Sequence, residues 1–297
     1  MMRSPDYERG RFFISPILGC NAQCYFCYIY DKGYAKKISK NSFSIESSID
    51  YLMQHDDFQL GVNGSIISIG AWGDPFPRYN KNACYFTLNW LKKLVELQNP
   101  IQIMSRYELH EEIIDGIIEC NKYKGQILYS TSISSLSQFR AIEPYSDEPE
   151  SRLKSLSTLR DKGIATNVMI KPFISGITDT EITEFIDIFK TYSIKHCVVG
   201  DLLVNNRVKE KFETLEFTNS LIKTTNLNQV LDCTSGESYE INTTENMLSF
   251  VSELSDYGIK VFKKSSCVNS FILNKKNPAN YIEFDPNCYC IQCGVCV

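Results

Sequence analysis

Three cysteines lie close together in the stretch Gly19-Cys20-Asn21-Ala22-Gln23-Cys24-Tyr25-Phe26-Cys27-Tyr28. Three residues separate the first pair, and two residues separate the second pair. Thiolates at this spacing on one loop are suited to ligate three irons of a four-iron cluster and leave the fourth iron open. The alternatives are incidental buried cysteines or a zinc site, and zinc would need a fourth Cys or His nearby. The nearest histidine, His55, lies one predicted helix away.

Strands and helices alternate around and after this loop. Apolar stretches predict six strands, at residues 12–18, 65–69, 101–104, 127–133, 166–170 and 197–204. Amphipathic stretches predict helices at 44–54, 82–97, 109–120, from 149 up to Gly163, and after a capping box at 178–181. Such alternation implies a parallel sheet, open or closed into a barrel, whose sites form at the carboxyl ends of the strands. The cysteine loop follows the first strand and therefore belongs to that edge.

The pattern loosens after residue 206. Residues 208–224 and 244–257 are predicted as helices and 259–262 as a strand, while the tail from Ser265 is expected to be loop-like. We therefore predict two parts, a core over 1–206 and an extension over 207–297.

Charge and composition limit the partners and the compartment. The net charge is −4 and no long run of Lys or Arg occurs, so a nucleic acid is not expected as a partner. No signal peptide and no apolar run of about 20 residues is present, so no membrane association is expected. The protein is expected to be cytoplasmic, where thiols stay reduced. Its 12 cysteines then favour metal or cluster binding over disulfides.

The C-x3-C-x2-C motif, with the aromatic Phe26 before its last cysteine, resembles the radical S-adenosylmethionine (SAM) superfamily. The resemblance covers about residues 10–206 and implies a partial (β/α)6 barrel of the α/β class, followed by a small cysteine-rich extension. It also implies a [4Fe-4S] cluster on Cys20, Cys24 and Cys27, with SAM chelating the fourth iron. Reductive cleavage of SAM would then give a 5′-deoxyadenosyl radical. Phe26 occupies the position that approaches the adenine.

Further segments strengthen the resemblance. In the turn Gly70-Ala71-Trp72-Gly73-Asp74-Pro75, the resemblance places Gly73 and Asp74 against the SAM amino group, and an N-capping Asp is the alternative. This Gly-Asp-Pro form is similar to the subgroup around spore photoproduct lyase. The resemblance also suggests candidates for the ribose and carboxylate contacts of SAM, with salt bridges at the barrel rim as the alternative: Ser132, Glu143, Arg152 and Lys171.

The chain ends in a second cysteine group, Asn287-Cys288-Tyr289-Cys290-Ile291-Gln292-Cys293-Gly294-Val295-Cys296. Cys288, Cys290, Cys293 and Cys296 predict either an auxiliary iron–sulfur cluster, with Cys267 as a possible replacement ligand, or a Zn(Cys)4 site. The family context favours the cluster. A third interpretation is a cysteine that gives a hydrogen atom to a substrate radical.

The sequence thus predicts a radical SAM enzyme that abstracts hydrogen from a small-molecule or peptide substrate. It would receive electrons from a reductant such as flavodoxin or ferredoxin. One alternative is repair or modification of a nucleic acid, as in spore photoproduct lyase. Another is a non-catalytic iron–sulfur or zinc protein for electron transfer, against which Phe26 and Asp74 argue, because an electron carrier has no use for them.

Overall fold

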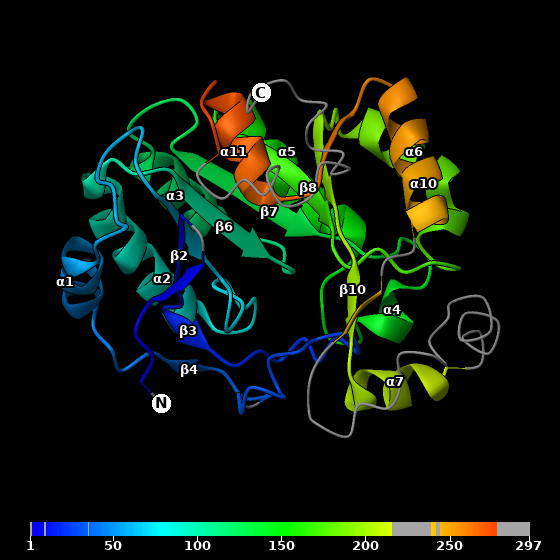
Figure 1. The fold of residues 1–297 in the computed structure, drawn as a ribbon, viewed down its shortest axis with the longest axis horizontal. Coiled ribbons are helices and arrows are strands. Elements are labelled where there is room, and N and C mark those ends of the chain that lie inside the picture. Colours follow the sequence, from blue (N-terminus) through cyan, green and yellow to red (C-terminus); the bar gives the residue numbers. More distant parts are fainter. Residues whose placement is uncertain (1, 9, 35, 216–238, 242–243, 278–297) are drawn as a thin grey trace.

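A mostly parallel sheet of 8 strands forms the centre of the computed structural model, which describes residues 2–8, 10–34, 36–215, 239–241 and 244–277 (Figure 1). Its strand order is β1-β2-β5-β6-β7-β8-β9-β12, and only β1 (Asp6–Glu8) runs antiparallel to its neighbour. The parallel strands are β2 (Arg11–Ile14), β5 (Ile66–Ile69), β6 (Ile101–Ser105), β7 (Ile127–Ser132), β8 (Ala165–Ile170), β9 (His196–Val199) and β12 (Lys260–Phe262). The partial (β/α)6 barrel expected from the sequence is confirmed by β2 to β9.

Helices follow the strands and cover the outer face of the sheet in two groups. One apolar cluster packs the first group on β2, β5 and β6 through Leu52, Leu91 and Ile117. A second cluster packs the other group on β7 to β9 through Leu156, Phe185 and Phe250. The helices are α1 (Ile45–Gln54), α2 (Lys81–Leu94), α3 (Glu111–Cys120), α4 (Phe139–Ile142), α5 (Pro149–Asp161), α6 (Ile182–Thr191), α7 (Asn206–Glu213), α10 (Thr244–Asp256) and α11 (Ser265–Ile272), with short 3-10 turns at Val95–Leu97 and Asp179–Glu181.

Local sequence explains several helix ends. Ser44 caps α1 through a hydrogen bond that its side chain accepts from the Ser47 amide. Pro149 opens α5, as expected. The predicted capping box at 178–181 is wrong, because Thr178 Oγ1 donates instead to the carbonyl of Ser134 and Glu181 accepts from the amides of Leu136 and Ser137. Glu181 therefore anchors the loop after β7, and α6 begins one residue later.

Two predicted strands end earlier than expected. The first strand stops at Ile14, and Ile17–Leu18 form β3, which pairs with β4 (Ser39–Lys40). The sixth stops at Val199, and β10 (Leu202–Val204) pairs with β11 (Tyr239–Ile241) in a separate sheet. The break occurs at Gly200, whose amide donates to Ile170 and whose carbonyl accepts from Phe173.

Part of the predicted extension packs directly on the core. Strand β12 pairs with β9 in parallel, and α10 contacts both α6 and β12. Figure 1 shows α6 and α10 side by side at the right of the view. The predicted helix at 208–224 is described only to residue 215, where α7 ends at Glu213. The division at residues 206 and 207 stays a prediction.

The expectation of a loop from Ser265 is wrong, because residues 265–272 form α11. This helix contacts β6, β8, β9 and β12, and it packs through Cys267 and Val268 on inward-facing Leu128, Met169 and Val198. It therefore covers part of the concave face of the sheet. The helix buries polar residues such as Asn269 against the sheet, so the sequence lacks the apolar periodicity by which an amphipathic helix is predicted. No helix in the described part of the chain is both long and apolar enough to cross a bilayer.

Candidate functional site

The start of the cysteine loop is fixed against the turn after β5. Gly19 donates its amide to the carbonyl of Trp72 at 2.8 Å and forms an isolated parallel bridge with Gly73. A Cβ atom on Gly73 would lie 2.6 Å from the carbonyl oxygens of both Gly19 and Ile17. Only glycine allows this approach, so Gly73 sets the position from which Cys20 leaves the sheet.

Further contacts fix the rest of the cysteine loop. The Tyr25 amide donates to the carbonyl of Ile142 at 2.9 Å, and the Tyr30 hydroxyl donates to the carbonyl of Cys20 at 3.0 Å. Arg207 at the start of α7 donates to the carbonyl of Cys27 and forms an ion pair with Asp31 at 2.8 Å. The loop is therefore held from several elements that are distant in the sequence.

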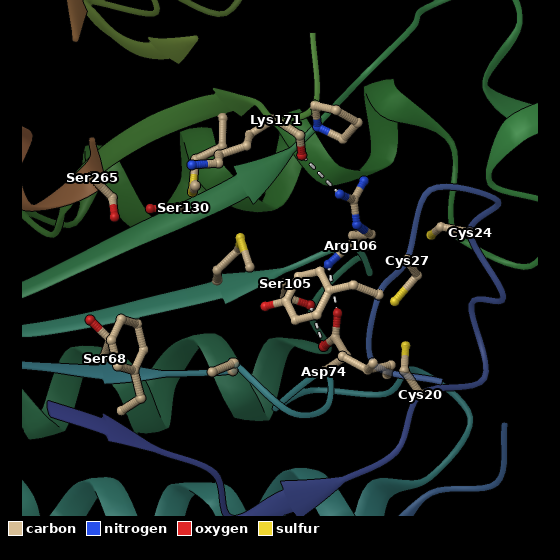
Figure 2. Close-up of a pocket in the computed structure, with 18 of the residues that line it drawn as sticks. Cys20, Cys24, Cys27, Ser68, Asp74, Ser105, Arg106, Ser130, Lys171 and Ser265 are labelled. Atoms are coloured by element: carbon tan, nitrogen blue, oxygen red, sulfur yellow. Dashed lines mark hydrogen bonds between the residues drawn. The ribbon is translucent and has the colours of Figure 1, made fainter. Parts of the chain in front are cut away.

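The loop opens onto a cavity of about 490 Å³ inside the half-barrel. Cys20, Cys24 and Cys27 all line this cavity, and Figure 2 shows their sulfurs facing a common space at one side of it. The carboxyl ends of β5 and β6 contribute further lining residues. The structure thus brings the three predicted ligands together at the edge of the sheet where sites of parallel α/β folds form.

The three thiols suit an iron–sulfur cluster. Burial raises the pKa of Cys20 to about 12 and also raises the pKa values of Cys24 and Cys27. Such thiols become thiolates only when a strong positive charge binds them, as a metal does. Within the described ranges, no three His, Cys, Asp or Glu side chains converge closely enough to hold a single ion. Three thiols that line one cavity are compatible with a larger cluster, in which each thiolate ligates one iron at a corner.

Phe26 and Arg106 line the cavity beside the cysteines. The guanidinium of Arg106 lies 4.8 Å from the centroid of the Phe26 ring. Burial lowers the pKa of Arg106, but Glu143 and the cysteines raise it more, so the net shift is upward and the side chain stays charged. The sequence reasoning missed Arg106. The signal that could have found it is a charged residue two positions after the apolar strand predicted at 101–104, at the carboxyl edge of the sheet.

Asp74 joins two loops at the cavity wall. Its Oδ1 accepts from the Phe76 amide at 2.9 Å and from Ser105 Oγ at 2.8 Å, and its Oδ2 accepts from the Arg106 amide at 2.8 Å. Burial raises the pKa of Asp74, although these hydrogen bonds act to lower it, and the net shift is upward. The carboxylate lines the cavity, and its predicted contact with the SAM amino group stays a prediction.

Glu143, Arg152 and Ser132 lie behind the cavity wall and not among its lining residues. Glu143 forms ion pairs at 2.7 Å with both Arg106 and Arg152, and Glu143 and Arg152 have no exposed side-chain surface. Burial raises the pKa of Glu143, but the two arginines outweigh that effect and hold the pKa below its usual range. The structure shows Glu143 and Arg152 in a buried salt bridge, and the predicted contacts of Ser132, Glu143 and Arg152 with SAM stay predictions.

Lys171 lies at the end of β8 and lines the cavity. Its carbonyl accepts from Ser132 Oγ and from Arg106 Nη2, each at 3.1 Å. Its side chain passes over Gly200, where an added Cβ would lie 2.9 Å from Lys171 Cδ. Of the four candidates for SAM contacts at the barrel rim, only Lys171 lines the cavity. Its contact with SAM stays a prediction.

The second cysteine group is not among the residues that the structure describes. Cys288, Cys290, Cys293 and Cys296 lie outside the described residues. Cys267, the possible replacement ligand, is buried in α11, where its sulfur accepts a hydrogen bond from Asn277 Nδ2 at 3.2 Å.

Comparison with known proteins identifies the fold. No family model and no curated protein matches the chain. A structure of spore photoproduct lyase complexed with dinucleoside spore photoproduct matches with a TM-score of 0.58 and 14% identity over 84% of this chain and 75% of that chain. SuiB from Streptococcus suis, bound to S-adenosylmethionine, matches at a TM-score of 0.46 and 19% identity, covering 63% of this chain and 39% of that one. TsrM from Kitasatospora setae, a radical S-adenosylmethionine methyltransferase, matches at 0.49 and 13% identity, covering 69% and 38%.

The last two matches are too partial to support an argument, and the first is too low in identity to carry more than the fold. That fold agrees with the resemblance drawn from the cysteine motif and from the Gly-Asp-Pro turn. The chain therefore has the fold of spore photoproduct lyase.

Proposed function

We propose that this chain is a radical SAM enzyme whose [4Fe-4S] cluster is held by Cys20, Cys24 and Cys27. The observation that carries the proposal is that these three thiols, two of them buried and one half-buried, line one cavity at the carboxyl edge of the parallel sheet. When bound there, a cluster with one open iron supplies the electron that cleaves SAM to a 5′-deoxyadenosyl radical, which takes hydrogen from a small-molecule or peptide substrate.

The residues around the thiols fit the charges of SAM. Asp74 lines the cavity with carboxyl oxygens, which are acceptors of the kind that an ammonium group needs. Phe26 offers a ring face of the kind that an adenine stacks on. Arg106, fixed by Glu143 and stacked on Phe26, keeps a positive charge close to the thiolates. These groups come from three different strand ends, so the chain pre-positions them before any ligand binds.

Water exclusion is the second contribution of the chain. Phe26 and Ile69 line the cavity, and Cys20, Cys24, Phe26 and Tyr107 share one apolar cluster with Ile142 and Ile174. A dry wall around the thiols limits access of water and oxygen to a reactive intermediate.

The direct test is anaerobic reconstitution with iron and sulfide, followed by reduction in the presence of SAM. We expect 5′-deoxyadenosine and methionine as products, measured by liquid chromatography. Cys24→Ser should abolish nucleoside release and lower the iron content. Cys120→Ala is the matched control, because Cys120 is buried in α3, within the apolar cluster that packs the first group of helices on the sheet. This variant should keep both the nucleoside release and the iron content of wild type. Reconstituted wild type that releases no nucleoside would refute the proposal.

We also propose a second iron–sulfur cluster on Cys288, Cys290, Cys293 and Cys296, supported by their spacing in the sequence. Wild type should hold about eight irons, and a variant with these four cysteines changed to alanine about four. Zinc in place of the additional iron, measured by elemental analysis, would favour the Zn(Cys)4 interpretation.

A further inference from the structure

The cavity has a second end, far from the cysteines, where a cationic side chain lies. Arg11 at the start of β2 lines the cavity together with Ser68, Gln102 and Ser265. Figure 2 shows Ser68 and Ser265 on the side of the cavity opposite Cys20, Cys24 and Cys27. Strands β2, β5 and β6 and the first residue of α11 therefore meet at this end.

Arg11 is held there by neutral groups only. Its Nη2 donates to Gln102 Oε1 at 3.0 Å, to Ser68 Oγ at 3.2 Å and to Ser265 Oγ at 3.4 Å. Its Nε is buried and has no hydrogen-bond partner among the described residues. Within the same part of the chain, Arg11 forms no ion pair, in contrast to Arg106 and Arg152.

Glu8 and Lys264 also line the cavity, as do the charged residues Asp74, Arg106, Lys171 and Asp201. Glu8 faces Arg11 across the antiparallel register of β1 and β2, yet no ion pair joins the two. Burial lowers the pKa of Arg11 to about 10, with Glu8 acting in the opposite direction, so the guanidinium is charged at neutral pH. A largely buried charge that forms no ion pair is costly, and a ligand of opposite charge would offset that cost.

The hydrogen bonds on Nη2 fix the guanidinium, and Nε is buried, so the two N–H groups of Nη1 remain for a ligand. Arginine forms paired, charge-assisted hydrogen bonds with the planar oxygens of carboxylates and with phosphates. The amino end of α11, which begins at Ser265, adds a partial positive charge to the same end of the cavity. All of these features select for a negatively charged group.

We propose that the Arg11 end of the cavity binds the carboxylate or phosphate group of the substrate, so that the enzyme acts on an anionic small molecule. The identification of this anion as part of the substrate rests on the proposed function. The existence of the anion site depends only on the residues described above, and it can be tested by binding measurements without catalysis.

The test uses titration calorimetry on the reconstituted protein at fixed ionic strength, with inorganic phosphate and glutarate as probes. We expect saturable binding of at least one probe, and the preferred probe separates a phosphate-bearing from a carboxylate-bearing substrate. Arg11→Gln should weaken binding about tenfold or more, and Arg11→Lys should weaken it less, because lysine keeps the charge but loses the paired donors. Lys276→Gln, a change at an exposed lysine, is the charge-matched control and should bind as wild type does.

Absence of saturable binding of either probe to wild type would overturn the inference, as would equal affinity in Arg11→Gln. Should Arg11→Gln fail to fold, the comparison of Arg11→Lys with wild type decides. The two proposals fail separately. Anion binding through Arg11 without release of 5′-deoxyadenosine refutes the proposed function alone, and nucleoside release without anion binding refutes this inference alone.

Discussion

The two ends of the cavity differ in how their charges are balanced. At the cysteine end, Glu143 pairs with both Arg106 and Arg152, and Asp74 accepts three hydrogen bonds. At the opposite end, the guanidinium of Arg11 donates hydrogen bonds to a glutamine and two serines and lies over the ring of Phe13. The first end is complete without a ligand and forms a rigid frame for the thiols. At the second end the positive charge of Arg11 is not balanced by an ion pair. We therefore infer that the cysteine end positions the thiols and that the Arg11 end recognises an anion.

The largest expected effect comes from breaking the frame at the cysteine end. Glu143→Ala leaves Arg106 and Arg152 without their shared counter-charge in a buried position and should lower the free energy of unfolding by about 3–5 kcal/mol. Urea unfolding measures this change. Glu112→Ala removes an exposed pair with Lys81 and should leave the stability unchanged. Equal stability of the two variants would contradict the description of Glu143 as the centre of the frame.

The next effect concerns the attachment of the cysteine loop. Gly73→Ala places a Cβ atom 2.6 Å from two backbone oxygens, so the loop must move, and we expect a loss of about 1–3 kcal/mol. We also expect less iron after reconstitution, because Gly19 and Cys20 shift together. Gly61→Ala is the control: it meets no atom within 4 Å, and its φ of +97° costs only about 1 kcal/mol. Full iron content in Gly73→Ala would show that the loop does not depend on this contact.

A third change makes the Arg11 end resemble the cysteine end. Gln102→Glu provides a carboxylate at the oxygen that Arg11 already contacts, and Asn269, whose Nδ2 has no partner among the described residues, gains an acceptor after its amide flips. We expect the stability to stay within about 1 kcal/mol of wild type or to rise, and binding of phosphate and glutarate to fall about tenfold. Unchanged anion affinity would indicate that the probes bind elsewhere.

The smallest effect on stability is expected from Arg11→Met. The variant loses three hydrogen bonds to neutral groups but also removes a largely buried charge that has no counter-ion. These effects offset each other, and the free energy of unfolding should change by less than about 1 kcal/mol. A loss as large as that of Glu143→Ala would mean that Arg11 is a structural residue, and the contrast between the two ends would disappear.

Local patterns were enough to predict most of the fold. The helices at 44–54 and 109–120 and the strands at 101–104 and 127–133 agree with α1, α3, β6 and β7 to within a few residues. The errors fall where residues distant in the sequence decide the structure. The strand predicted at 197–204 breaks at Gly200 because loop residues after β8 bond to it. The tail forms α11 in part because Ser265 and Asn269 form hydrogen bonds with Gln102 of β6 inside the barrel.

The sequence by itself determined the cysteine spacing, the alternation of strands and helices, and hence the edge of the sheet that carries the thiols. These are local properties, set by the order of neighbouring residues along the chain. Only the tertiary structure decided which charges are balanced. Arg106 meets Glu143 across 37 positions and Arg11 meets Ser265 across 254. Charge balance depends on which side chains packing brings within a few ångströms, and no short pattern in the sequence contains that information.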